Sequence, residues 1–324
     1  MRTHTTLART IAVALVALGT GACSDAAAPV APVAPSAPSL AKGGPNALPK
    51  NGRIYFSSAL TGGSSEVYSM NADGSDRKRL TYTNDEYDQY LAVSRDGKKL
   101  VVTAQPEGVF ETRIYTMNTD GTSRRFVTSL SDGIITDPVW SPDGRTIAYV
   151  ARPGGSDPEI WTVSTNGGKA TRLTPTGQRA GWPSYSPDGS RIVFAANAPG
   201  EVKQSLYIMN ADGSNPQLLH ACDPGCASPV WTPDGGQVVY TVIDGTTVHV
   251  RTCLLVQPVP FCGISTGIDL TSSLTFDLSP DGSQIAYMST ISDTDRIGTA
   301  NLNGSAQTFV TPDLSPIFDL AWGR

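Results

Sequence analysis

Short runs of alternating hydrophobic and polar residues fill the chain from residue 51 onward. Examples are "RTIAYVA" at 145–151 and "SRIVFAA" at 190–196, and a second kind of run includes "RIYTM" at 113–117 and "EIWTV" at 159–163. Successive side chains of a strand point to opposite faces of its sheet, so this alternation predicts half-buried antiparallel β-strands. Tight-turn residues separate the runs, and no stretch has the 3.6-residue period of an amphipathic helix. The pattern therefore predicts an all-β fold.

One seven-residue stretch, "PVWSPDG" at 138–144, recurs along the chain. Its copies are "LAVSRDG" (91–97), "PSYSPDG" (183–189), "PVWTPDG" (229–235) and "FDLSPDG" (276–282). Proline presets φ, aspartate stabilises the bend, and glycine adopts the left-handed conformation easily, so S-P-D-G is interpreted as a hairpin turn between the first two strands of a unit. A second turn, N-A-D-G, is expected between its third and fourth strands. The aspartates recur because the turns recur, and we assign them no catalytic or metal-binding role.

The glycines of the first turn, together with Gly52, are spaced 45 to 47 residues apart. This interval is typical of one four-stranded blade of a β-propeller. The end of the chain, "FDLAW" at 318–322, matches a first strand without its turn, and "NGRIYFSS" at 51–58 matches a second strand without its first. Joining these two strands in one blade closes a ring, so we predict a six-bladed β-propeller of four-stranded antiparallel blades over residues 51–324. The fifth blade is expected to be irregular, with an extended hairpin at 249–270.

Residues 1–22 have the features of a secretory signal peptide. A basic start precedes the apolar run "TIAVALVAL" at 10–18, and small residues then lead to Cys23. The run is shorter than the ~20 residues that span a bilayer as a helix. Its end resembles the lipobox of bacterial lipoproteins, in which the cysteine is lipidated, although Thr20 stands where that pattern prefers leucine. The alternative is ordinary cleavage with no role for Cys23.

Residues 23–50 are rich in alanine and proline and almost free of charge. Such a segment cannot form a packed core and favours extended polyproline II, so it is predicted to be a tether. Ser24, directly after the cysteine, resembles an outer-membrane sorting signal. The expected location is the bacterial cell envelope, with the protein held by its lipid alone and facing the periplasm or the exterior.

Charge and cysteine content narrow the class of protein further. The formal net charge is −5, and no run of lysine and arginine suggests a nucleic-acid partner. An even number of cysteines after Cys23 favours disulfides in an exported chain, and the short spacings favour Cys222–Cys226 and Cys253–Cys262. The other two pairings remain open, and a four-cysteine zinc site fits the spacings poorly. We expect a monomer.

The recurring pattern of W-S-P-D-G, I-A-Y and I-Y-x-M-N-A-D-G-S resembles the WD-like propeller repeat of the TolB family, the periplasmic component of the Tol–Pal envelope system. The resemblance covers residues 51–324 and implies an envelope protein that binds a protein partner. TolB itself has a separate N-terminal domain, where this chain has a lipobox and an Ala-Pro tether. Related propellers occur in prolyl-oligopeptidase-type peptidases and in oligogalacturonate lyases, so the fold alone does not define the function.

Aligning the first strands of the six blades places one residue of each near the mouth of the central channel. These residues are Tyr90, Asp137, Trp182, Ser228, Thr275 and Asp319. Their carboxylates, aromatic rings and hydroxyl groups could hold a peptide or a sugar by hydrogen bonding and stacking. Alternatively, half of them only pack or contact water. The loops on the face opposite the S-P-D-G turns vary from blade to blade, so we expect a ligand to dock on that variable-loop face.

One acidic loop is a weak candidate for calcium binding. The segment "NDEYD" at 84–88 offers Asp85, Glu86 and Asp88, although it lacks the ligand spacing of a calcium loop. The alternative is a solvated acidic loop. No other cofactor is expected.

No credible catalytic constellation is present. "GISTG" at 263–267 matches G-x-S-x-G, but that nucleophile requires a strand-turn-helix context and a later histidine, whereas the last histidine, His249, precedes Ser265. We therefore expect a lipid-anchored envelope propeller, without enzymatic activity, that binds an envelope protein, a peptide segment or a glycan at the channel mouth. The alternative is a polysaccharide lyase or glycoside hydrolase that uses Asp137 and Asp319 as paired carboxylates.

Overall fold

The computed structural model describes most of the chain after the predicted tether. It covers residues 52–323, apart from 60–62, 130–132, 199, 256–259, 272, 292–293, 313 and 315. The predicted signal peptide and tether lie outside the described residues. Apart from strands and turns, the described residues include a short 3₁₀ helix, η2 (Pro153–Gly155). None of their helices has the length and hydropathy needed to cross a membrane.

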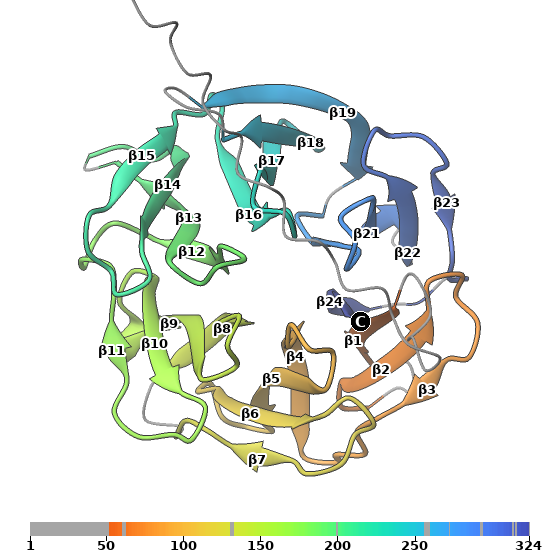
Figure 1. The fold of residues 1–324 in the computed structure, drawn as a ribbon. Coiled ribbons are helices and arrows are strands. Elements are labelled where there is room, and N and C mark those ends of the chain that lie inside the picture. The colour runs from red at the N-terminus through yellow and green to blue at the C-terminus, as the bar shows by residue number, and fades with distance from the viewer. Residues whose placement is uncertain are drawn as a thin grey trace, which may run out of the picture. The chain divides into compact units, whose positions relative to one another are not determined.

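Six four-stranded antiparallel sheets surround a common centre as the blades of a propeller (Figure 1). We number the blades 1 to 6 in chain order and name the innermost strand of each first. Blades 1 to 3 are β24 (Ile317–Gly323), β1 (Arg53–Ser58), β2 (Glu66–Asn71), β3 (Lys78–Arg79); β4 (Glu86–Val93), β5 (Lys99–Pro106), β6 (Arg113–Asn118), β7 (Arg125–Phe126); and β8 (Ile134–Trp140), β9 (Thr146–Arg152), β10 (Glu159–Ser164), β11 (Thr171–Arg172). Blades 4 to 6 are β12 (Gly181–Tyr185), β13 (Arg191–Asn197), β14 (Gln204–Asn210), β15 (Gln217–His220); β16 (Cys226–Trp231), β17 (Gln237–Asp244), β18 (Thr247–Leu254), β19 (Phe261–Thr271); and β20 (Phe276–Leu278), β21 (Gln284–Ile291), β22 (Thr294–Asn301), β23 (Thr308–Phe309). The predicted six-bladed all-β propeller is confirmed.

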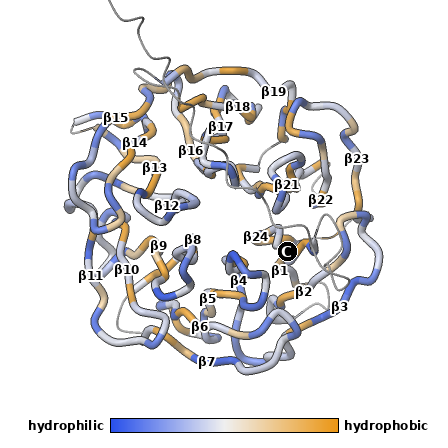
Figure 2. The backbone as a smooth tube through the Cα atoms, viewed as in Figure 1, coloured by the Kyte–Doolittle hydropathy of each residue, from blue (hydrophilic) through white to orange (hydrophobic). Residues whose placement is uncertain are grey.

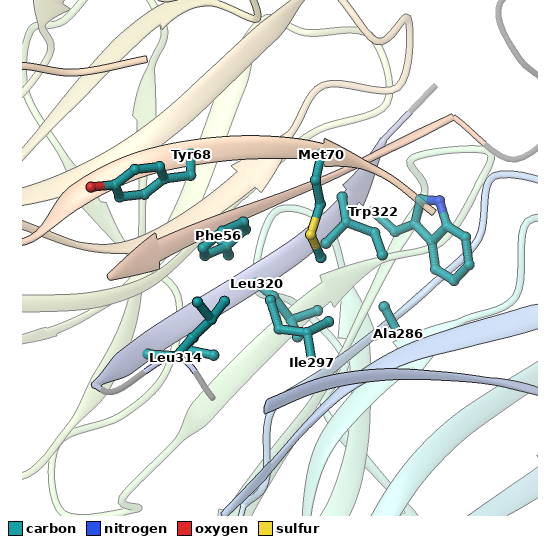
Figure 3. Close-up of a cluster of buried hydrophobic side chains, with 10 residues drawn as sticks. Phe56, Tyr68, Met70, Ala286, Ile297, Leu314, Leu320 and Trp322 are labelled. Carbon is teal, nitrogen blue, oxygen red and sulfur yellow. The ribbon is translucent and has the colours of Figure 1, made fainter. Parts of the chain in front are cut away.

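The two ends of the propeller meet in blade 1, as the sequence predicts. Strand β24 pairs antiparallel with β1, with Tyr55 opposite Ala321 and Phe56 opposite Leu320. The side chains of this blade pack against blade 6, where Ile297 lies in the same buried cluster as Phe56 (Figure 3). The last strand of the chain is therefore the innermost strand of the first blade.

The second strands are more deeply buried than their alternating pattern predicts. In β13 every residue after Arg191 is buried, and in β9 all residues from Ile147 to Ala151 are buried. Figure 2 shows hydrophobic residues along such middle strands and hydrophilic residues in the turns. The prediction of half-buried strands is wrong for these strands, because each blade is covered on both faces by its neighbours.

Three tryptophans at the ends of innermost strands contribute to the packing between blades. Trp140, Trp231 and Trp322 are buried, and the indole nitrogen of Trp140 donates a hydrogen bond to the Ala92 carbonyl oxygen of blade 2 at 3.3 Å. The same sequence position in three blades thus fills the same kind of space, as expected for an inter-blade core residue.

Blade 5 has the extended hairpin that the sequence predicts. Strands β18 and β19 are its third and fourth strands, and the disulfide Cys253–Cys262 joins them near the hairpin loop. The second disulfide, Cys222–Cys226, closes the connection from blade 4 to blade 5. Both pairings favoured by the spacings are present in the structure.

The glycines of the second turns lie against the preceding blade. In blade 2, a Cβ atom added to Gly121 would lie 2.5 Å from the Leu80 carbonyl oxygen of blade 1, and in blade 4 one added to Gly213 would lie 2.9 Å from that of Leu173 in blade 3. Both glycines also have positive φ. These turns therefore need glycine for their conformation and for close contact between blades.

Replacing Gly121 with alanine should destabilise the propeller more than replacing Gly144. Both residues have positive φ, so each alanine costs about 1–2 kcal/mol of conformational energy, but an added Cβ at Gly144 meets nothing within 4 Å. We expect a decrease in Tm of roughly 2–5 °C for Gly144→Ala and at least about twice that for Gly121→Ala, measured by circular dichroism. Equal decreases would show that the contact between blades adds nothing to stability.

A buried charged cluster occupies the start of β4. Glu86 forms ion pairs with Arg113 and Arg124, and these guanidinium groups hold its pKa below the usual value although burial acts to raise it. Asp88 is fully buried, with a carboxylate oxygen 3.9 Å from Arg124. Burial raises the pKa of Asp88 to about 7, although Thr81 and Arg124 act to lower it. The folded protein therefore favours the protonated form of Asp88 below neutral pH.

The raised pKa of Asp88 makes stability depend on pH. The folded state binds this proton up to about pH 7, whereas the unfolded chain releases it near pH 4, so the free energy of unfolding should fall as pH rises between these values. Asp88→Asn should reduce this loss by a few kcal/mol, measured as urea unfolding at pH 5 and pH 8. Asp73→Asn is the matched control, because the pKa of that exposed turn carboxyl is lowered and lies below the range tested. A pH dependence that is the same in both variants would contradict the assignment.

Candidate functional site

The structure brings the six residues of the sequence alignment to one central cavity of about 390 Å³. We call them the ring residues: Tyr90 of β4, Asp137 of β8, Trp182 of β12, Ser228 of β16, Thr275 just before β20, and Asp319 of β24. Each blade contributes one of them, five from an innermost strand and Thr275 from the position just before one. Their predicted meeting at the channel is therefore seen in the structure, while their role in binding stays a prediction.

Irregular backbone marks the ring level in three adjacent blades. Asp137, Trp182 and Ser228 have φ values of 48°, 50° and 48°, in the left-handed region, and a proline follows each of them. The register of β8 with β9 shifts between Thr136 and Val139, and β12 and β16 have equivalent shifts. Such bulges change the direction of a side chain, and left-handed conformations cost energy for residues other than glycine. The innermost strands are thus distorted where they line the cavity.

The cavity extends from the ring residues toward the S-P-D-G turns. Its lining there comes from the prolines of these turns, Pro142, Pro187, Pro233 and Pro280. Among the described residues, the lining includes none from the second-to-third-strand loops. The cavity therefore opens along the side of the S-P-D-G turns, because an innermost strand runs from the ring level directly into its S-P-D-G turn. Docking of a ligand on the variable-loop face stays an untested prediction.

One turn differs from the others at the rim of the cavity. Arg95 stands where four other turns have proline, and its guanidinium donates a hydrogen bond to the Pro187 carbonyl oxygen of blade 4. Arg95 is exposed and also lines the cavity. The divergent copy "LAVSRDG" thus places one positive charge at a rim otherwise formed by prolines.

The carboxyl groups of the cavity have raised pKa values. Burial raises the pKa of Asp137 to about 6, although a hydrogen bond from Thr136 and the charge of Arg152 act to lower it. Burial also raises the pKa of Asp319 well above its usual value, and the charges of Asp137 and Asp277 add to this effect. Asp319 therefore lies within the electrostatic influence of both Asp137 and Asp277.

Sequence analysis missed Asp277 as a member of this group. It lines the cavity, and burial raises its pKa to about 6, although hydrogen bonds from the backbone N–H groups of Trp322 and Leu278 act to lower it. Asp277 lies two residues after Thr275, and residues two apart in a strand share a face. This spacing could have identified it.

Two of the carboxylates also connect neighbouring blades. Asp319 accepts a hydrogen bond from the Leu91 N–H group of blade 2 at 2.9 Å, and Asp277 accepts one from the Trp322 N–H group of blade 1 at 2.8 Å. Asp137 differs from them, because its hydrogen bond comes from Thr136 of its own strand at 2.7 Å. Among the described residues, its other carboxylate oxygen has no hydrogen-bond donor. Asp137 is thus the acidic group best placed to contact a ligand.

The acidic loop considered for calcium is largely engaged in the fold. Glu86 is paired with two arginines and Asp88 is buried. Across the described part of the chain, no three histidine, cysteine, aspartate or glutamate side chains are grouped so as to hold a metal ion. Calcium binding through Asp85, Glu86 and Asp88 stays an untested prediction.

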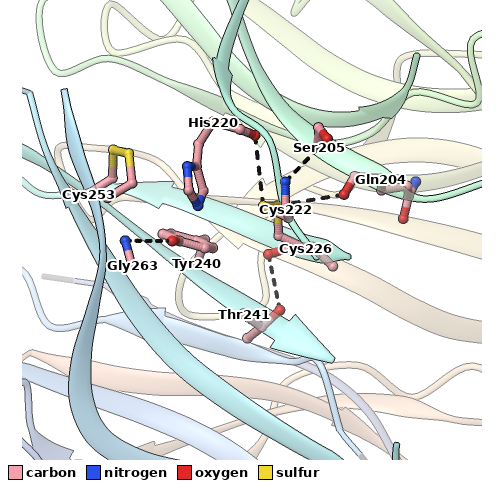
Figure 4. The surroundings of a disulfide bond; sticks show 11 residues. Gln204, Ser205, His220, Cys222, Cys226, Tyr240, Thr241, Cys253 and Gly263 are labelled. Carbon is pink, nitrogen blue, oxygen red and sulfur yellow. Dashed lines mark hydrogen bonds between the residues drawn. A yellow bond between two sulfur atoms is a disulfide. The ribbon is translucent and has the colours of Figure 1, made fainter. Parts of the chain in front are cut away.

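A second cavity, of about 310 Å³, lies beside the Cys222–Cys226 disulfide in blade 5. Its lining includes His220, whose ring lies edge-on to that of Tyr240 (Figure 4). His249 also lines this cavity. The nearby Ser265 lies within strand β19, where it accepts a hydrogen bond from Arg251, and not on a strand-turn-helix elbow. Nothing in this geometry makes Ser265 a nucleophile.

Comparison with known proteins supports the resemblance of the sequence to the TolB family. The model of the TolB beta propeller domain matches residues 91–252. The chain is 37% identical over 54 residues to the Tol-Pal system protein TolB of Coxiella burnetii, covering 17% of this chain and 12% of that protein. It is 34% identical over 83 residues to the uncharacterized peptidase YuxL of Bacillus subtilis, covering 26% of this chain and 12% of that protein. The match therefore spans about an eighth of these relatives' length.

Solved structures share the fold at low sequence identity. The crystal structure of TolB from Acinetobacter baumannii superposes with a TM-score of 0.70 at 18% identity, covering 85% of this chain and 68% of that one. An oligogalacturonate lyase in complex with manganese superposes with a TM-score of 0.56 at 16% identity, covering 80% of this chain and 73% of that one. Such identities show the fold alone. With the family model matching half of its length, the chain belongs to the family of the TolB beta propeller domain.

Proposed function

We propose that the protein is a binding module of the bacterial cell envelope, and that a segment of a partner docks in the central cavity from the side of the S-P-D-G turns. The observation that carries this proposal is the chemistry of the ring residues. The residues that build the turns repeat from blade to blade, whereas the ring residues at one equivalent level are carboxylates, aromatic rings and hydroxyl groups. A purely structural channel has no need for such diversity, least of all at the three positions, Asp137, Trp182 and Ser228, that have a left-handed backbone.

The size of the cavity limits what can enter it. About 390 Å³ is within the range of small-molecule sites, so it can accept one or a few residues of a chain but not a folded domain. The bulk of a protein partner would then rest on the surrounding turns. The membership in the TolB beta propeller family supports a protein as the partner, since one relative is named as a component of the Tol-Pal system.

An enzymatic alternative also has one observation in its favour. Asp137 and Asp319 face the same cavity with raised pKa values, as carboxyl groups that act as general acids do. Release of reducing ends or unsaturated products from envelope or plant glycans, abolished by Asp137→Asn, would replace the binding proposal with this one. The two histidines among the described residues line the second cavity and not the central one.

Photo-crosslinking in the envelope of the native host tests the docking site. A photoreactive phenylalanine analogue at Trp182 should yield a defined adduct, and adding Asp137→Ala and Asp319→Ala should remove it. The matched control places the same analogue at Phe110, which is 84% exposed in the β5–β6 loop on the opposite face, and should give no such adduct. Adducts from Phe110 but not from Trp182 would contradict docking at the central cavity.

The proposed lipid anchor can be tested separately from binding. Cys23→Ser should move the full-length protein from the membrane fraction to the soluble fraction, because it removes the thiol that carries the lipid. Thr20→Leu is the control, since it brings the sequence closer to the lipobox and should leave the protein in the membrane fraction. Continued membrane association of Cys23→Ser after a carbonate wash would rule out the lipid anchor.

A further inference from the structure

We propose that the central cavity recognises a lysine side chain of the partner, which enters past the proline rim and places its ammonium group among the carboxylates of Asp137, Asp277 and Asp319. This inference rests on the proposed function and specifies the chemistry of the docked segment.

The negative charge of the cavity belongs to one shared space. Asp319 lies within the electrostatic influence of both Asp137 and Asp277, and the hydroxyl of Tyr90 lies within that of Asp137 and Asp319. Burial, together with these two charges, raises the pKa of Tyr90 to about 12, so its hydroxyl stays neutral and available as a hydrogen-bond partner. Three carboxyl groups and a tyrosine from blades 1, 2, 3 and 6 thus face the same region.

Few positive charges oppose this group. Arg152 lowers the pKa of both Asp137 and Tyr90, but it is exposed at the end of β9, and Arg95 is at the rim, hydrogen-bonded to Pro187. Among the described residues, neither arginine forms an ion pair of 4.0 Å or less with a carboxylate of the cavity. The Asp137 carboxylate, which lines the cavity, is therefore not ion-paired with an arginine of the described residues, although Arg152 is near enough to lower its pKa.

The spacing of the carboxylates favours an organic cation over a metal ion. A metal ion requires several ligands at 2.0–2.6 Å, and the described residues bring no three such side chains close enough to hold one. Asp277 and Asp319 also use oxygens to accept backbone hydrogen bonds from neighbouring blades. An ammonium group, which donates three hydrogen bonds at longer distances, fits carboxylates that stand further apart.

The wall between the rim and the carboxylates favours lysine among the possible carriers of an ammonium group. Prolines of the turns and apolar residues of the innermost strands, such as Val139 and Val230, line this part of the cavity. A lysine side chain has a four-carbon stem that can lie along such apolar surface while its charged end reaches a polar group. The free amino terminus of a chain has no such stem.

Isothermal titration with short peptides tests this inference on the folded propeller. The probe is acetyl-Ala-Lys-Ala-amide, and its isostere acetyl-Ala-norleucine-Ala-amide keeps the stem but lacks the charge. At pH 8 the lysine peptide should bind and the norleucine peptide should bind at least about tenfold more weakly, which corresponds to 1.4 kcal/mol or more. Asp137→Asn should weaken binding of the lysine peptide by a similar factor. Glu201→Gln, at an exposed acid away from the cavity, is the matched control and should leave binding unchanged.

The pH dependence of peptide binding is a second measurement, and a purely structural role of Asp137 would not change it. Because the pKa values of Asp137 and Asp277 are about 6, lowering the pH from 8 to 5 should protonate both and weaken binding of the lysine peptide. The Tyr90 hydroxyl stays neutral and Arg95 and Arg152 stay charged over this range, so they do not reverse the sign. In Asp137→Asn the remaining dependence should be shallower. Melting curves at both pH values show whether each variant is folded.

The possible results separate this inference from the proposed function. Equal binding of the lysine and norleucine peptides, or binding of the unblocked peptide Ala-Ala-Ala-amide in place of the lysine peptide, would overturn the assignment to lysine. If neither binds but crosslinks still form at Trp182, the docking function stands and the lysine assignment fails. If neither binds and no crosslink forms, both proposals fail.

Discussion

The antiparallel pairing of β24 with β1 is the interaction on which the rest of the structure depends. It joins the last strand of the chain to the first and so leaves every blade with two neighbours. A single four-stranded sheet whose second strand is buried on both faces would expose much hydrophobic surface if one neighbour were lost. The buried cluster shared by blades 1 and 6 shows what closure protects, since Phe56 and Ile297 come from opposite ends of the sequence and pack together (Figure 3). Closure also leaves no long open sheet edge between the termini.

The central cavity is a consequence of the same closure. Six innermost strands must converge around one axis, and their side chains there cannot all pack in the way that second strands do. The left-handed residues Asp137, Trp182 and Ser228 show how the chain accommodates this convergence, by distorting the backbone in front of a proline in three adjacent blades. Asp319 and Asp277 then use carboxylate oxygens to connect blades that backbone pairing does not join. Asp277 and Asp319 therefore have a structural role in the acidic lining. Asp137 makes no hydrogen bond to another blade among the described residues.

Much of this architecture could be predicted from the sequence because the physical requirements repeat. Turn residues at intervals of 45 to 47 positions define the blades, and the same register places the ring residues on equivalent strands. The full burial of the second strands could not be predicted, since alternation describes one sheet and not the cover provided by its neighbours. The position of the cavity on the side of the S-P-D-G turns was also missed. Sequence variability among loops shows where residues differ, but it does not show where the packed side chains leave a cavity. Arg95 and Asp277 were missed because neither occupies the aligned ring position. Arg95 replaces a turn proline, and Asp277 lies two residues after Thr275, so both reach the cavity only through the course of the innermost strands.

The aspartates of this chain have different properties because their surroundings differ. Asp188, in an S-P-D-G turn, accepts hydrogen bonds from Ser186 and from the Ser190 N–H group, and these bonds lower its pKa to about 2. Asp137, seven residues before an equivalent turn glycine, is enclosed by protein and has a pKa raised to about 6. The turn carboxylate is charged at all physiological pH values and is hydrogen-bonded by the residues of its own loop, so its place in the fold is explained by the turn. Burial makes the Asp137 carboxyl group costly to ionise, and one of its oxygens accepts no hydrogen bond from the part of the chain that the structure describes. Under these conditions a cation from a ligand stabilises the ionised form most strongly. The contrast between these two groups, which look alike in the sequence, therefore supports the proposed binding role of the cavity.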